Sequence, residues 1–169
     1  SCLARRDDAA ALAALREAEN RLPEAIEVQT GIGAATLRLG QHVAAAGALR
    51  RVLQAAPDRV DALIDLGTAL AAIGELDEAL ALHRRAAERA PDDFSAQFAL
   101  ALTLHRRLDG AELVSHCRQL LARRPDETSV LMLLAVGTIW LGRFDEARSA
   151  LRRVLSLQPN YPDAQRLLA

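Results

Sequence analysis

The chain has 169 residues, an apolar fraction of 51% and a formal net charge of −1. This length suits one ordinary domain or a short array of repeats, and the apolar fraction suffices for a hydrophobic core. The near-zero charge excludes a global attraction to nucleic acid or to anionic membranes, and Cys2 and Cys117 form neither a CxxC motif nor a disulfide framework.

The N-terminus lacks the charged and apolar regions of a secretory signal, so we expect a cytoplasmic protein. The longest apolar stretch, residues 130–141, is too short to span a bilayer, which predicts no membrane insertion. Ser1-Cys2 leaves open the alternative of a tethered periplasmic lipoprotein, although a helix starting near Asp7 leaves almost no tether.

Five prolines recur at a constant interval of 34 residues: Pro23, Pro57, Pro91, Pro125 and Pro159. Proline has no amide hydrogen and cannot continue a helix, so a constant proline interval predicts a constant interval between helix ends. The phrase Gly, spacer, large apolar residue, Asp-Glu-Ala also recurs, starting at Gly74 and at Gly142. Internal repetition with this period is typical of stacked helical repeats.

With proline at position 32 of each unit, the complete units are residues 26–59, 60–93, 94–127 and 128–161. Residues 1–25 predict a partial repeat that retains the second helix alone, over residues 7–22. Residues 162–169 predict the start of a further first helix. Solenoids usually end in polar capping units, and neither end has one, so we expect a fragment of a longer array.

Each unit predicts two helices separated by a glycine at position 15, where a left-handed C-cap conformation is expected at Gly40, Gly74 and Gly142. In the third unit Leu108 holds this position, and the glycine shifts to Gly110. The small residues at positions 8 and 20 are expected to face each other, and larger residues at 7, 24 and 27 to pack against the next unit. Position 8 contains Gly33, Gly67, Ala101 and Ala135, and position 20 contains Ala45, Ala79, Leu113 and Ala147.

These columns resemble the tetratricopeptide repeat (TPR) family, which has small residues at 8, 20 and 27 and proline at 32. The resemblance covers nearly the whole chain and implies an all-α fold, a right-handed α-solenoid of stacked antiparallel helix pairs (TPR superhelix). The sequence departs from the family at position 4, where Gln29 and Gln97 alternate with leucine. It also departs at position 11, where Thr36, Leu70, Leu104 and Thr138 replace the usual tyrosine.

No pattern in the chain predicts catalysis, so we expect no enzyme, no cofactor and no metal site. The four histidines have no base or nucleophile at triad-like spacing, and the common nucleotide, protease and hydrolase motifs are absent. His83 and Cys117 share position 24, a packing column, and His116 next to Cys117 does not complete a metal shell.

Arginine pairs recur late in the second helices, at Arg50-Arg51, Arg84-Arg85 and Arg152-Arg153. A phosphate-binding ridge is one interpretation of them. The other is that they cap helix ends and pair with Asp and Glu of the same layer, which the interleaved acidic residues and the scarcity of aromatic residues favour. We therefore expect no nucleic-acid partner.

The resemblance implies that positions 2, 5, 9, 12 and 13 of the first helices line a concave groove, which here starts acidic and becomes apolar. The same apolar strip is equally consistent with burial by the curvature of the array or by further repeats. The candidate ligand-contacting residues are Arg38, Ile64, Phe98, Leu102, His105, Arg106, Met132, Val136, Ile139 and Trp140.

We therefore predict a non-catalytic protein–protein interaction scaffold that binds a peptide or helix with apolar anchors, and we also expect self-association through the open ends of the array. The acidic-tail clamp of chaperone-binding TPR proteins is excluded, because its positions hold Thr30, Ala34, Asp65, Ser95 and Ala99. The alternative is a substrate-presenting or regulatory module of a larger enzyme, such as a sulfotransferase or glycosyltransferase. The Ala-, Leu- and Arg-rich composition suits a GC-rich bacterium.

Overall fold

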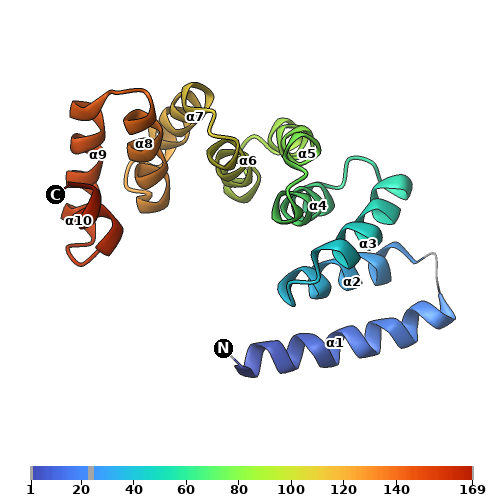
Figure 1. The fold of residues 1–169 in the computed structure, drawn as a ribbon. Coiled ribbons are helices and arrows are strands. Elements are labelled where there is room, and N and C mark those ends of the chain that lie inside the picture. Colours follow the sequence, from blue (N-terminus) through green and yellow to red (C-terminus); the bar gives the residue numbers. More distant parts are fainter. Residues whose placement is uncertain (1, 23–24, 169) are drawn as a thin grey trace. The chain divides into compact units, whose positions relative to one another are not determined.

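The computed structural model describes residues 2–22 and 25–168, with the backbone alone for residues 2–6 (Figure 1). Ser1, Pro23 and Ala169, which entered the sequence interpretation, lie outside these residues, as does the side chain of Cys2. The described residues form ten α-helices and no strand, which confirms the expected all-α class. The helices are α1 (Cys2–Arg21), α2 (Ile26–Arg38), α3 (His42–Ala55), α4 (Val60–Ile73), α5 (Leu76–Arg89), α6 (Phe94–Arg106), α7 (Gly110–Arg123), α8 (Thr128–Trp140), α9 (Phe144–Leu157) and α10 (Pro162–Leu168).

The chain divides into two compact units, residues 1–99 and 100–169, and the boundary falls within α6. In the first unit each helix from α1 to α4 packs against the next one along the chain. In the second unit α8 packs against both α7 and α9, and α10 packs against α9. Each pair of consecutive helices thus buries an apolar face that neither helix covers alone, as expected for stacked repeats.

Ala and Leu from adjacent helices form the core of both units. In the first unit one cluster joins Leu49 of α3 to Leu66 and Leu70 of α4. In the second unit the buried side chains include Leu113 and Cys117 of α7, Leu134 of α8, and Leu151 and Val154 of α9. Small residues between these larger ones allow close approach of the helix backbones.

The second helices end at the residues that the proline period predicts. Helices α3, α5, α7 and α9 each stop two residues before a proline, at Ala55, Arg89, Arg123 and Leu157. The intervening residue leaves the helical conformation, with φ between −131° and −136° and ψ between 71° and 86°, because the following proline ring disfavours the helical region. Its amide still donates to the carbonyl four residues earlier, for example from Ala90 to Ala86 at 2.9 Å.

The first helices end in a left-handed residue at position 15. Gly40, Gly74 and Gly142 have φ values of 76°, 93° and 70°. In all four complete units the amide of the next residue donates to the carbonyl five residues earlier, the hydrogen-bond pattern of a Schellman motif. These bonds are Gln41–Thr36, Glu75–Leu70, Asp109–Leu104 and Arg143–Thr138, with N–O distances of 2.8, 3.0, 3.1 and 2.9 Å.

In the third unit the turn stays at position 15, although the glycine of the sequence is displaced to Gly110. Leu108 itself adopts φ 60° and is 70% exposed, while Gly110 is the buried first residue of α7. The Schellman bonds fix the turn at position 15 whatever residue stands there. A Cβ on Gly110 would lie 3.4 Å from the carbonyl oxygen of Gly137, so this glycine serves the approach of α7 to α8.

The side chain at position 24 lies directly over the glycine of position 8. A Cβ on Gly67 would overlap the imidazole of His83, and one on Gly33 would lie 2.6 Å from Leu49 Cγ. His83 and Leu49 both stand at position 24 of their own units. The large residue of this column therefore fills the space above the glycine within its own helix pair.

Candidate protein-binding surface

A stripe of incompletely buried residues runs along α8 at helical spacing. Val130, Leu131, Leu133–Ala135, Gly137 and Thr138 are buried, whereas Met132, Val136 and Ile139 are half-buried and Trp140 is 38% exposed. The spacing of i, i+4, i+7 and i+8 puts these four side chains on one face of the helix. They are the four candidate contact residues of α8.

The part of α6 that belongs to the second unit has the same arrangement. Thr103 and Leu104 are buried, whereas Leu102 is 42% exposed, His105 is half-buried and Arg106 is exposed. The rings of His105 and Trp140 stack, with centroids 5.1 Å apart and an interplanar angle of 28°. This contact joins position 12 of one first helix to position 13 of the next, so it brings the candidate residues of α6 and α8 together.

The electrostatic environment of the stack is free of acidic side chains on its own helices, because neither α6 nor α8 contains Asp or Glu. Burial lowers the pKa of His105 below its ordinary value of 6.5, and the positive charge of Arg106 lowers it further. The imidazole is therefore neutral at physiological pH and presents an aromatic face beside a guanidinium group.

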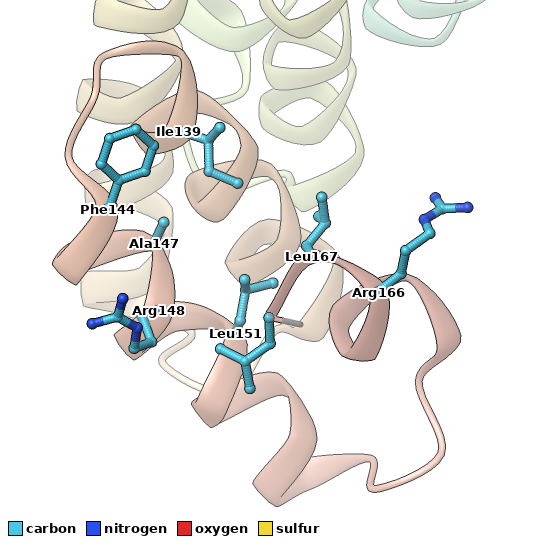
Figure 2. A pocket seen from close by; sticks show the side chains of 8 residues that line it. Ile139, Phe144, Ala147, Arg148, Leu151, Arg166 and Leu167 are labelled. Atoms are coloured by element: carbon cyan, nitrogen blue, oxygen red, sulfur yellow. The ribbon is translucent and has the colours of Figure 1, made fainter.

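Ile139 lines a separate cavity of about 330 Å³ between α8, α9 and α10 (Figure 2). Phe144, Leu151 and Leu167 provide its apolar wall, and Arg148 and Arg166 lie on opposite sides in this view. Phe144 is 62% exposed and was not among the sequence candidates. The sequence did contain a signal for Phe144. It is the large apolar residue that precedes Asp-Glu-Ala in the phrase starting at Gly142, at position 17 of the repeat.

The candidates in the first unit have a different, acidic surrounding. Arg38 Nε donates to Asp8 Oδ1 at 2.6 Å, so this cation has a carboxylate partner. The pKa of Asp65 on α4 is raised, first by burial and then by the charge of Asp61. Ile64 is half-buried on the same helix.

Aromatic residues are also paired in the first unit. Phe98 stacks on Phe94, one helical turn before it, at 5.4 Å between ring centroids. Both rings are half-buried. Phe98 is therefore part of an aromatic pair within its own helix.

The recurring arginines of the second helices bind carboxylates 27 or 28 residues away along the chain, in adjacent repeats. This pairing favours a structural role for these arginines over a phosphate-binding ridge. The ion pairs join neighbouring repeats, whereas pairing within one layer was expected. The pairs are Arg50–Glu78, Arg85–Asp58, Arg118–Glu146 and Arg153–Asp126, with N–O distances of 2.9, 2.6, 2.6 and 2.5 Å.

His83 and Cys117 are core residues, as their column predicts. His83 is 2% exposed, and its Nε2 lies 3.1 Å from the carbonyl oxygen of Ile64. Burial lowers the pKa of His83 and raises that of the Cys117 thiol to about 12. Among the described residues, no group of three His, Cys, Asp or Glu side chains is arranged to hold a metal ion. No helix of this part of the chain is both long and apolar enough to cross a membrane.

Comparison with known proteins identifies the fold. The TPR family model matches residues 36–104 and 102–169, and no curated protein sequence matches the chain. The solved structure of MamA MSR-1 is 26% identical, with a TM-score of 0.76 over 85% of this chain and 82% of that chain.

Two more distant structures resemble the chain in fold alone. YrrB, described as a TPR protein with an unusual peptide-binding site, is 20% identical, with a TM-score of 0.84 over 95% of this chain and 83% of that chain. MamA from Desulfovibrio magneticus RS-1 is 17% identical, with a TM-score of 0.79 over 85% of this chain and 81% of that chain. The expected solenoid fold class is confirmed, and since the family model spans more than half of its length, the chain belongs to the tetratricopeptide repeat family.

Proposed function

We propose that the chain is a non-catalytic protein–protein interaction scaffold whose first helices bind a peptide or helix with apolar anchors. Membership of the TPR family, whose members are interaction modules, supports the scaffold role. One observation carries the proposal of a binding surface: the stacked His105–Trp140 pair lies in a stripe of incompletely buried side chains. A protein of this kind is expected to act in the cytoplasm.

The chemistry of this stripe suits protein binding. Tryptophan is enriched among the residues that dominate interface energies, and methionine adapts its shape to different partners. Covering one large apolar side chain contributes about 1.5–3 kcal/mol. The proposed contact residues are Arg38, Ile64 and Phe98 in the first unit, and Leu102, His105, Arg106, Met132, Val136, Ile139 and Trp140 in the second. YrrB supports the idea in general terms, since a protein of the same fold is described as having a peptide-binding site.

Selection from a random peptide display library on the immobilised chain tests this function. Trp140→Glu and Leu102→Glu each put a carboxylate on the proposed surface, at residues that are 38% and 42% exposed. Val43→Glu is the matched control, because Val43 is 74% exposed on the second helix α3. All three variants should retain the helical circular dichroism of the wild type, since surface substitutions usually change stability little.

The proposal requires that peptides selected by the wild type are lost from both surface variants and retained by the control. In addition, the emission of Trp140, the one tryptophan of the chain, should shift to shorter wavelength when a selected peptide binds. Selected peptides that bind all three variants equally well would contradict a binding site on the first helices.

A further inference from the structure

The proposed binding surface of the second unit is built from apolar and aromatic side chains. The α6–α8 surface consists of Leu102 and His105 of α6 with Met132, Val136 and Trp140 of α8. The stacked rings of His105 and Trp140 connect the two helices. Met132 and Trp140 are eight residues apart, so the surface extends about 12 Å along α8. What these side chains offer to the backbone of a bound segment decides which conformation the segment can have.

Most charges of the second unit lie away from this surface. Residues 1–99 contain 11 arginines and 15 Asp or Glu residues, a net charge of −4, whereas residues 100–169 contain 10 arginines and 7 acidic residues, a net charge of +3. Yet α8 contains no charged residue. Arg106, at the end of α6, has interactions of its own within the chain. A charged side chain pressed onto the surface would therefore lose water without gaining a counter-charge, which favours an uncharged partner face.

Hydrogen-bonding side chains are also scarce on the α6–α8 surface. Thr103 and Thr138 are buried, and the hydroxyl of Thr138 donates to carbonyls of its own helix. Ser129 is exposed, but it lies near the start of α8, about 16 Å along the helix axis from the stacked rings. Neither α8 nor residues 100–106 contain Asn, Gln, Asp or Glu. The polar group beside the stack is thus the imidazole of His105 itself.

An extended segment would fit such a surface poorly. About four extended residues cover 12 Å, and each has one amide donor and one carbonyl acceptor. Those groups that turn toward the α6–α8 surface would lose water, and the surface offers them the His105 imidazole in exchange. A helix satisfies the same groups within its own backbone and presents side chains alone to the surface.

We propose that the α6–α8 surface binds an amphipathic helix of another protein through an uncharged apolar stripe, and not an extended peptide. This inference rests on the proposed function of the same surface and specifies the conformation of the partner. Apolar side chains at i, i+3 or i+4, and i+7 of the partner helix span about 10 Å, which matches the length of the surface along α8. They pack against the His105–Trp140 stack and the exposed side chain of Leu102, while polar residues of the partner face solvent.

The conformation of a library peptide selected by the wild-type chain tests this inference. The library peptides should be long enough for about four helical turns, so that helical and extended binders compete. A 13C-labelled synthetic peptide of the selected sequence should show helical Cα chemical shifts over about two turns or more when bound to the unlabelled chain. Cα shifts of extended backbone in the bound peptide would overturn the inference.

Substitutions in the peptide provide a matched comparison. Two positions at which alanine leaves the affinity unchanged are chosen, because such positions face solvent in the complex. Glycine at both should weaken binding about tenfold or more relative to alanine, since each glycine disfavours a helix by about a factor of five. Proline at the more central position should abolish binding. Glycine and proline peptides that bind within about twofold of the alanine peptide would contradict a helical partner.

Met132 allows the complementary test in the protein. Met132→Gln adds an amide to the surface at nearly constant size, whereas Met132→Leu keeps it apolar. Because Met132 is half-buried, both variants should retain the helical circular dichroism of the wild type. Met132→Gln should weaken the selected peptide about fivefold, since its amide loses water without a partner, and Met132→Leu should change the affinity less than about twofold. Equal or tighter binding to Met132→Gln would indicate an extended backbone that uses the added amide.

Failure of the inference and failure of the proposed function are distinguishable. If the selected peptides are lost from Trp140→Glu and Leu102→Glu but bind the wild type in an extended conformation, the surface binds peptides and the helical partner is wrong. If no peptide is selected, or if the selected peptides bind both variants as well as the wild type, the proposed function and the inference fail together.

Discussion

Leu108 occupies a backbone conformation that glycine holds in the other three complete units. Its φ of 60° brings the side chain against the backbone, which costs about 1–2 kcal/mol for an L-residue. The side chain is 70% exposed, so it contributes little burial to compensate. The conformation of Leu108 is held by the Schellman hydrogen bond of this turn, from the Asp109 amide to the Leu104 carbonyl.

Leu108→Gly should therefore raise the free energy of unfolding by about 1 kcal/mol, after allowing for the greater flexibility of glycine in the unfolded chain. Urea unfolding measures this change. Gly142→Leu is the converse substitution at the same position of the next unit, where φ is 70°, and should be destabilising. A Leu108→Gly protein less stable than the wild type would contradict the strain argument.

His83 is a buried titratable group, and its lowered pKa makes stability depend on pH. Because the unfolded residue titrates near 6.5 and the folded one titrates lower, the unfolded state binds more protons on acidification. Stability is complete above about pH 6.5 and falls as the pH drops toward the folded pKa, by at most about 1.4 kcal/mol per pH unit.

His83→Leu should reduce this loss of stability between pH 7.5 and pH 5.5 in urea unfolding. Leucine fits the site, because Leu49 occupies the same position of the first complete unit beside Gly33 and is fully buried. The remaining pH dependence should include His105, whose pKa is lowered as well. An unchanged pH dependence in the variant would exclude His83 as a source of the effect.

At the scale of the helical element, the approach of paired helices depends on the glycine of position 8. In the second complete unit the His83 ring lies directly over Gly67, so any side chain at position 67 must displace the ring. Gly47 in α3 is also helical, but it is exposed and a Cβ there would have no neighbour within 4 Å. Substitution of Gly67 therefore tests helix packing, whereas substitution of Gly47 tests helix propensity alone.

Gly67→Ala should lower the free energy of unfolding by about 1–3 kcal/mol through overpacking. Gly47→Ala should raise it by about 0.5–1 kcal/mol, since alanine loses less backbone entropy in a helix. Thermal melts of both variants measure the difference. The opposite order of melting temperatures would contradict the assigned contact between positions 8 and 24.

Threonine at position 11 shows how an element accommodates a departure from the family pattern. Thr36 and Thr138 are buried where the family has tyrosine, so their hydroxyl groups need hydrogen-bond partners inside the protein. The Thr138 Oγ1 donates to the carbonyls of Leu134 and Ala135, both at 2.8 Å. Satisfied within its own helix, the hydroxyl needs no partner from the neighbouring helix.

At the scale of the whole molecule, the opposite charges of the two units predict association between chains. Net charges of −4 and +3 attract each other across molecules where salt does not screen them. At about 10 mM salt the Debye length is about 30 Å, and at 1 M it is about 3 Å. Sedimentation should therefore show concentration-dependent oligomers at low salt that dissociate at high salt. Oligomers that strengthen with salt would instead indicate association through exposed apolar side chains.

The sequence determined the features that depend on local chemistry and on periodicity. The 34-residue proline interval predicted the ends of α3, α5, α7 and α9, because a residue before proline leaves the helical conformation. Packing columns predicted that His83 and Cys117 are buried. The resemblance to the TPR family supplied the candidate residues of α6 and α8, and those of the second unit are incompletely buried. Their role in binding stays a prediction.

Tertiary structure decided which side chains meet across helices. No local rule distinguishes position 20 from position 24 as the partner of Gly67, because that choice depends on the angle and distance between two packed helices. The stacking of His105 on Trp140 and the cavity beside Phe144 likewise join residues from different helices.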